Sequence, residues 1–240
     1  MSEFQKHDYR IPQFHGKWPF VCVLGMQEPA SVLFSILNGL TNAYAYYKYR
    51  SRVSVGYPMY NVVFWQFVFA VNAWIWSSVF HARDKIWTER LDYFCATYLV
   101  VYSLYVSIHR WTYELQIQSR KSVRWFAAGS LTAIYIGHVS YLSFRSFDYS
   151  YNMIMNVAIG IANSISWLVL AFVKRKHWHM WRIVATVLST NIFVLLELLD
   201  FPPYWWTFDA HSLWHMATVP LPLFLYRFYA DESLMLSKMP

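Results

Sequence analysis

The chain has 240 residues, of which 57% are hydrophobic and 21% aromatic, while only 14% are charged. Soluble proteins carry about 25% charged residues, so this composition argues against a water-soluble protein, and seven glycines and nine prolines argue against a fibrous or disordered one. The formal net charge is +7, but no basic stripe interleaved with aromatic residues indicates nucleic-acid binding.

Long apolar runs, separated by charged or proline-marked breaks, divide the chain into segments long enough to cross a membrane. A spanning helix needs about 20 mostly apolar residues. Glu28-Pro29 marks the start of the first run, because proline at the first helical position loses no intrahelical hydrogen bond. The connections are short and leave no room for a second domain. In chain order we predict spans at 29–47, 58–81, 92–109, 123–144, 152–173, 181–199 and 209–229.

Lysines and arginines are distributed unevenly between the two sides of these spans. Thirteen of the 20 lie on the side of the C-terminus. Because positively charged loops are retained in the cytosol, we predict an all-α membrane protein, a seven-transmembrane helix bundle with a lumenal N-terminus and a cytosolic C-terminus. Its parts are a lumenal segment 1–28, a seven-span domain 29–230 and a cytosolic tail 231–240. Residues 1–18 show no signal peptide, so we expect that the first span inserts unaided or that a natural N-terminal piece is missing.

Ionisable and polar residues gather at one end of the predicted spans. Charged groups are costly in a membrane, so each is a functional candidate. Ser77 and His81 are four residues apart near the end of the second span and therefore share one helix face. His211 and His215 repeat this spacing at the start of the seventh span, and Asp92 opens the third. Since successive spans alternate in direction, all five residues are expected at the lumenal boundary.

Three histidines and a carboxylate at one depth suit a catalytic zinc ion, which takes imidazole nitrogens and keeps one position for water. Zinc lowers the pKa of its bound water to about 7 and polarises a carbonyl group. In this interpretation the histidines hold the metal and Asp92 orients or deprotonates the water. Either Ser77 or its neighbour Ser78 donates a hydrogen bond to the oxyanion.

Less specific roles must be weighed for the same residue types. A histidine pair on an apolar helix also serves for hydrogen bonding between helices. Glu197 and Asp200 approach the lumenal boundary from the sixth span and are candidates for tuning the site. For His138, in the middle of the fourth span, a packing role is favoured. On the cytosolic side we expect solvated or headgroup-facing histidines at positions His109, His177 and His179.

Longer motifs throughout the chain resemble those of one known family. They are FHGKWPF (14–20), GMQEPASV (25–32), SxxxH (77–81), LDY (91–93), HVSYL (138–142), LELLDFPP (196–203) and DAHxxWH (209–215). On these motifs the chain resembles the post-GPI-attachment-to-proteins factor three family, the PER-like GPI phospholipases. The resemblance extends from about residue 14 over essentially the whole chain.

The resemblance implies a seven-span hydrolase related to alkaline ceramidases and adiponectin receptors. It assigns Zn²⁺ to His81, His211 and His215 and catalytic roles to Ser77 and Asp92, and it favours Ser77 over the neighbouring serine. The implied reaction removes the sn-2 acyl chain from a glycosylphosphatidylinositol anchor in the endoplasmic reticulum or Golgi. The implied partners are therefore GPI-anchored proteins and their lipid. Family members usually begin with a signal peptide and a cysteine-rich lumenal segment, and we expect this chain to lack both.

Two other functions stay open on the residues alone. The first is a lipid amidase acting on ceramide, because the same zinc chemistry attacks an amide. The second is a non-catalytic seven-span receptor that keeps zinc for its fold, in which Asp92→Ala leaves lipid turnover unchanged. A G-protein-coupled receptor is less favoured, because histidines clustered at one boundary suit a metal better than a ligand pocket.

Overall fold

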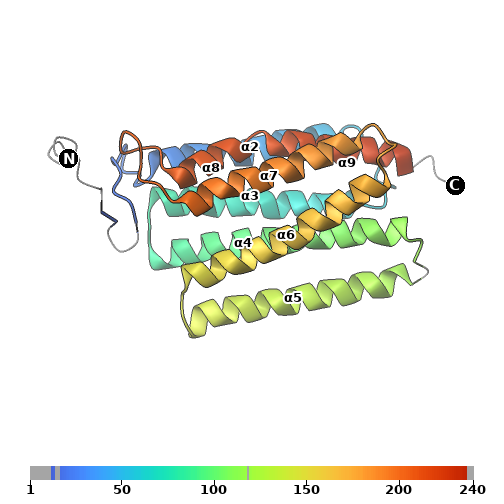
Figure 1. The fold of residues 1–240 in the computed structure, drawn as a ribbon, viewed down its shortest axis with the longest axis horizontal. Helices are drawn as coiled ribbons and strands as arrows, with labels where there is room; N and C mark the ends of the chain where they lie inside the picture. The colour runs from blue at the N-terminus through green and yellow to red at the C-terminus, as the bar shows by residue number, and fades with distance from the viewer. Residues whose placement is uncertain (1–11, 14–16, 118, 237–240) are drawn as a thin grey trace.

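The computed structural model describes residues 12–13, 17–117 and 119–236, and within these ranges it contains α-helices and no strand. Most helices run along one long axis, with the start of α2 and the C-terminal end of α9 at opposite ends (Figure 1). The parts of the predicted N-terminal segment and C-terminal tail at 1–11, 14–16 and 237–240 lie outside the described residues. The helices are α2 (Pro29–Arg50), α3 (Tyr60–Ala82), α4 (Ile86–Glu114), α5 (Arg120–Phe144), α6 (Tyr149–Val173), α7 (Met180–Leu199), α8 (Ala210–Thr218) and α9 (Leu221–Leu236).

The first six predicted spans each correspond to one helix, from α2 to α7. α4 is longer than predicted at both ends. It begins at Ile86 because the Lys85 backbone N–H donates to Thr88 Oγ1 at 2.9 Å, which caps the helix earlier. Asp92 therefore lies in the second turn of α4 and does not open it, which corrects the prediction.

The seventh predicted span is two helices rather than one. α8 ends at Thr218 and α9 begins at Leu221. Pro220 and Pro222 lie at this junction, and proline has no N–H to continue an intrahelical ladder. α9 also continues to Leu236, so the first residues of the predicted cytosolic tail are helical.

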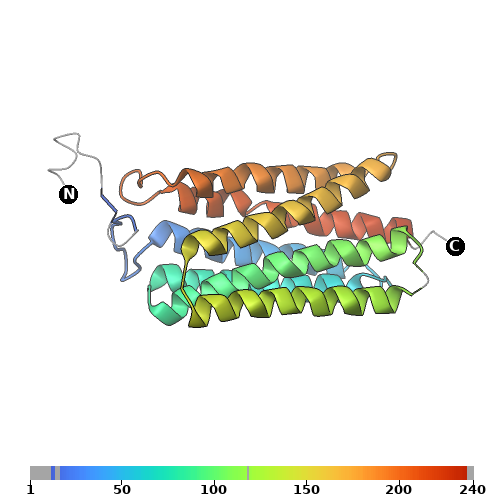
Figure 2. The ribbon, with the colours of Figure 1, turned by 60° about the horizontal axis from the view of Figure 1, so that its bottom comes forward.

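Four helices, α3, α4, α6 and α7, are long and apolar enough to cross a membrane. α5 lies at the edge of the bundle, packed against α4 (Figures 1 and 2). Its outer face exposes Trp125 at 77% and Phe126 at 78%. Contiguous apolar surface of this kind is typical of contact with lipid. The structure thus supports a membrane protein, whereas the count of seven spans and the orientation of the termini stay predictions.

Aromatic side chains fill the core at the end of the bundle where α2 ends and α3 begins. Tyr46 stacks on Phe67 with ring centroids 4.2 Å apart, and Tyr226 of α9 packs edge-on against Tyr46. Tyr229 is buried and donates its hydroxyl proton to Gln66 Oε1 at 2.9 Å. This aromatic core ties α9 to α2 and α3.

A buried ionic network joins α4, the start of α7 and α9 in the same half of the bundle. Arg110 Nη2 lies 2.5 Å from Glu232 Oε1, and both side chains are buried. His179 Nε2 lies 2.5 Å from the other oxygen of Glu232. His179 and His109 are buried, so the prediction that they are solvated or headgroup-facing is wrong. The turn before α7 directs His179 into the bundle, where its Nε2 atom forms a hydrogen bond with the Glu232 carboxylate.

Candidate metal centre

The three predicted metal-binding histidines lie together. His81 comes from the last turn of α3, whereas His211 and His215 come from the same face of α8. The His211 Nε2 atom lies 3.2 Å from His81 Nε2 and 2.9 Å from His215 Nε2. All three ligand atoms lie within 4.8 Å of one another, so the cluster can hold a metal ion.

The opposite ring nitrogen of each histidine has a hydrogen-bond partner. His81 Nδ1 lies 2.6 Å from Glu28 Oε2, His211 Nδ1 lies 2.5 Å from Glu197 Oε2, and His215 Nδ1 lies 2.9 Å from Ser35 Oγ. A carboxylate only accepts, so the Nδ1 atoms of His81 and His211 carry the protons. Their Nε2 lone pairs are then available to a metal ion, and the Nε2 atoms lie close enough together to share one. This is the pattern of metal-ligating histidines, and three imidazole nitrogens form a donor set that zinc uses, so the residues present fit the metal.

Local capping interactions place the histidines at this position. Asp209 caps α8, since its carboxylate accepts from the Ser212 N–H at 2.9 Å and its own N–H donates to Ser212 Oγ at 3.0 Å. α8 therefore begins at Ala210, which puts the two histidines one turn apart on one face. The acidic residue of the DAHxxWH motif thus has a structural role.

The start of α2 is fixed to the end of α3 by main-chain hydrogen bonds. The Glu28 N–H donates to the His81 carbonyl at 3.0 Å, and the Gln27 N–H donates to the Ala82 carbonyl at 3.2 Å. These bonds explain how the GMQEPASV motif places the Glu28 carboxylate against the His81 ring. From the sequence, Glu28 was assigned only to the start of a helix. A carboxylate at a predicted membrane boundary could have indicated a role at the site.

The two neighbouring serines of α3 have different surroundings. Ser77 Oγ lies 3.0 Å from Ser35 Oγ, which in turn contacts the His215 ring. Ser78 Oγ instead donates to the Trp74 carbonyl of its own helix at 2.8 Å. Ser77 is therefore the serine connected to the histidines. Ser35 was missed because serine is common in membrane helices and gives no distinguishing signal.

The other predicted site residues separate into those near the histidines and those away from them. Asp92 is half-buried, and its charge interacts with His81 and His211. Glu197, a predicted tuning residue, contacts His211, whereas Asp200 accepts hydrogen bonds from Trp18 Nε1 at 2.7 Å and from Gln13 Nε2 at 2.9 Å. Away from the cluster, His138, Asn152 and Thr97 form a hydrogen-bonded group between helices.

The segment before α2 covers this end of the bundle. Lys17 forms ion pairs with Asp84, between α3 and α4, and with Glu89 in the first turn of α4. Burial alone would lower the pKa of the Lys17 ammonium, but its hydrogen bond to Asp84 and the charge of Glu89 outweigh this effect and raise the pKa. Lys17 therefore stays charged and holds the described part of this segment, from residue 17 onward, against the start of α4 and the loop before it.

Comparison with known proteins identifies the family. The family model described as the Per1-like family matches residues 1–233. The chain belongs to the Per1-like family. This confirms the family resemblance predicted from the motifs.

Relatives of this Per1-like chain cover nearly all of its length. The "GPI-specific phospholipase A2-like PGAP3" of Xenopus tropicalis is 44% identical over 239 residues, which are 99% of this chain and 74% of the relative. The human protein of that name is 42% identical over 236 residues, or 98% and 72% of the two chains. "Post-GPI attachment to proteins factor 3" of Drosophila melanogaster is 40% identical over 228 residues, or 93% and 68%. No solved structure matches the chain. The four long apolar helices of the chain support a multi-pass membrane protein.

The carboxylates behind the histidines yield a testable expectation for this Per1-like chain. Glu197→Gln keeps the size of the side chain but removes its negative charge. The neutral amide therefore holds the His211 ring less firmly than the carboxylate does. Zinc affinity should fall by about 10- to 100-fold, the usual effect of changing a residue behind a metal ligand. Competition with a fluorescent zinc chelator measures this change.

Asp200→Asn is the matched control, because Asp200 is a nearby carboxylate that bonds Trp18 and Gln13 instead of a histidine. We expect the control to bind zinc as the parent chain does. Equal zinc affinity for Glu197→Gln and the parent would contradict the assigned role of Glu197.

Proposed function

We propose that the chain hydrolyses the sn-2 acyl ester of the glycosylphosphatidylinositol anchor on proteins, with Zn²⁺ held by His81, His211 and His215. The observation that carries this proposal is the convergence of three Nε2 atoms whose opposite Nδ1 atoms are all hydrogen-bonded. Family membership and the names of the relatives supply the substrate. Those names refer to GPI and not to ceramide or a receptor, so we do not favour the amidase and receptor alternatives.

The proposal includes a membrane arrangement. Helices α2 to α7 make six crossings, and the α8–α9 pair makes the seventh, with residues 1–28 lumenal and the C-terminus cytosolic. Tyr204 and Trp205 are 62% and 82% exposed in the loop before α8, near the histidine end, and aromatic residues favour the membrane–water interface. The candidate site then lies at the depth of the glycerol ester, in the endoplasmic reticulum or Golgi membrane.

Each side chain around the site has a chemical task in this proposal. A bound zinc ion would supply a Lewis acid for the ester carbonyl and a water molecule of lowered pKa. The carboxylates of Glu28 and Glu197 hold the Nδ1 protons and fix the orientation of the imidazole rings. Asp92 accepts the proton of the attacking water and returns it to the departing lysolipid alcohol. The products are a lyso-GPI protein and a free fatty acid.

The direction of the hydrogen bonds from His215 through Ser35 indicates the role of Ser77. If His215 Nε2 faces the metal, its Nδ1–H donates to Ser35 Oγ. The Ser35 hydroxyl then donates to Ser77 Oγ, which leaves the Ser77 proton free to point toward the substrate. A fixed donor of this kind stabilises the oxyanion that forms on the ester carbonyl. Ser35 is therefore a positioning residue for Ser77.

An assay with the purified full chain tests the proposal. Parent protein in lipid nanodiscs should release one fatty acid from a GPI lipid and leave ceramide intact. Asp92→Asn should retain zinc and slow the release by about 10²- to 10⁴-fold, the usual contribution of a general base. The Ser78→Ala variant should keep the parent rate, since among the described residues the Ser78 hydroxyl bonds the Trp74 carbonyl and no site residue.

Cleavage of ceramide in preference to the GPI lipid would overturn the proposed substrate class. A parent rate in Asp92→Asn would overturn the proposed role of that carboxylate. Mass spectrometry of the released lipids measures both outcomes.

A further inference from the structure

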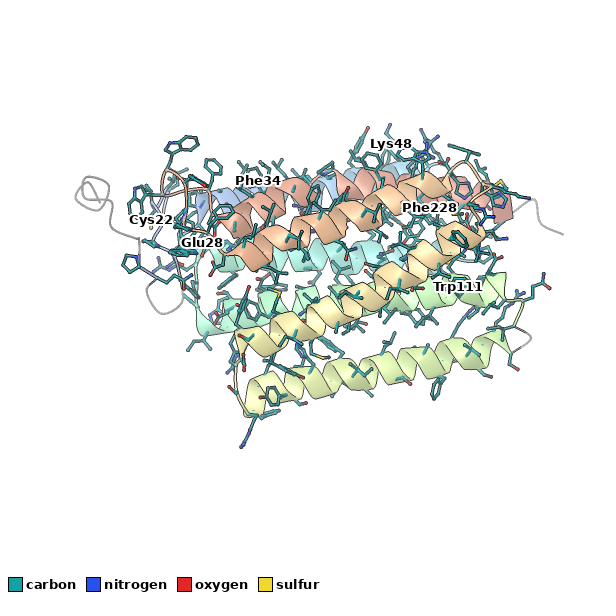
Figure 3. The ribbon with its side chains drawn as sticks, in the orientation of Figure 1. Cys22, Glu28, Phe34, Lys48, Trp111 and Phe228 are labelled. Atoms are coloured by element: carbon teal, nitrogen blue, oxygen red, sulfur yellow. The ribbon has the colours of Figure 1, made fainter. Side chains whose placement is uncertain are left out.

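A cavity of about 340 Å³ lies between the C-terminal part of α2 and α9. Tyr49 and Tyr226 line it with buried rings, while Leu223 on its rim is 43% exposed. It lies at the opposite end of the bundle from the candidate metal centre. Lys48 on its rim lies thirteen positions after Ser35 in α2, which corresponds to about 20 Å along a helix. Figure 3 shows Lys48 and Glu28 at opposite ends of the structure.

Three cations from two segments converge on the rim of this cavity. They are Lys48 at the end of α2, Arg52 just after it, and Arg227 on α9. None of the described residues that line the cavity is acidic. Positive charges gathered around a partly apolar hollow are complementary to an anionic group that carries an apolar body.

The charge on this rim is only partly neutralised by the protein. Arg227 Nε lies 3.3 Å from Asp231 Oδ2, but the same oxygen also contacts Arg182 at 2.9 Å. Lys48 lies over the Tyr44 ring, 5.6 Å from its centroid. Within the described part of the chain, neither Lys48 nor Arg52 forms an ion pair with a carboxylate. Two cations at the cavity are therefore available to an external anion.

The surroundings of the cavity favour a lipid as the source of that anion. Leu40 and Tyr44 on α2 are 61% and 55% exposed and continue from the cavity along the outer helix surface. Basic pockets between membrane helices on the cytosolic side bind anionic lipid headgroups, and the positive-inside distribution predicts that this end is cytosolic. We propose that this cavity, lined by Lys48, Arg52 and Arg227, binds the phosphate headgroup of an anionic phospholipid, with the acyl chains along α2 and α9.

Native mass spectrometry of the full chain in detergent tests this proposal. The probes are dioleoyl phosphatidic acid and dioleoyl phosphatidylcholine, which differ only in the headgroup. The parent chain should bind one phosphatidic acid in preference to phosphatidylcholine. In the Lys48→Gln/Arg52→Gln variant the affinity for phosphatidic acid should fall by about 30-fold, because each basic residue near an anionic lipid contributes about fivefold.

A variant with the same charge change elsewhere is the control. Arg50→Gln/Lys176→Gln removes two exposed cations that do not line the cavity, and it should bind phosphatidic acid as the parent does. Because all four side chains are exposed, both variants should keep the thermal unfolding midpoint of the parent.

Three results would overturn the proposal. The first is a parent chain with no preference for phosphatidic acid. The second is an equal loss of affinity in both double variants, which would mean that the lipid is attracted by the overall positive charge and not by this cavity. The third is full displacement of the lipid by low concentrations of inorganic phosphate, which would identify a free-phosphate site.

Discussion

Replacing His211 with alanine is expected to abolish stoichiometric zinc binding and, with it, hydrolysis. His211 Nε2 lies within 3.2 Å of both other Nε2 atoms, so its removal leaves two imidazoles and no complete donor set. Zinc affinity should fall by more than about 100-fold, beyond the usual effect of changing a residue behind a ligand. Metal analysis of the purified chain by mass spectrometry measures this loss directly.

His138→Ala is the matched control for this variant. It removes a buried histidine from α5, where the ring contacts Asn152 and Tyr151 and no other histidine of the described residues. We expect it to retain one zinc per chain. Retention of zinc in His211→Ala, or loss in both variants, would contradict the assignment of the metal centre.

Replacing Glu232 with alanine is expected to destabilise the fold by about 3–5 kcal/mol, the usual cost of removing one partner from a buried ion pair. Arg110 is only 2% exposed, and its Nε and Nη2 both contact this carboxylate, at 2.6 and 2.5 Å. His179 also loses its hydrogen-bond partner, because the same carboxylate contacts its Nε2 and no other described residue hydrogen-bonds its ring. Thermal or denaturant unfolding in detergent micelles measures the change.

Two comparisons make this prediction specific. Arg110→Leu/Glu232→Leu should recover much of the loss, because it leaves no uncompensated charge on this pair. Glu89→Ala removes a carboxylate paired with the half-exposed Lys17 and should cost less than about 1 kcal/mol. A Glu232→Ala chain as stable as the Glu89→Ala chain would contradict a structural role for the network.

Helix positions could be predicted because apolar runs and charged breaks are local features. The first six predicted spans match α2 to α7 for this reason. The convergence of His81 with His211 and His215 could be predicted because spans that alternate in direction bring the end of one beside the start of another. The break between α8 and α9 was missed because Pro220 lies within an apolar run that is long enough to span alone.

Partners contributed by other helices could not be predicted from local patterns. Glu28 and Ser35 reach the histidines only because α2 packs against α3 and α8. In the same way, His179 contacts Glu232, which lies 53 positions further along the chain, so no local pattern indicates this pair. Sequence spacing places residues on a helix face, but the packing of helices decides which faces meet.

Rescue of GPI-anchor remodelling in cells that lack this activity tests whether the chain is a zinc-dependent GPI lipase. The chain and its His211→Ala and Asp92→Ala variants would be compared at matched expression, with anchor acyl chains read by mass spectrometry. We expect that the parent restores removal of the sn-2 acyl chain and that neither variant does. Rescue by either variant at the parent level, or no rescue by a folded and correctly located parent, would contradict it.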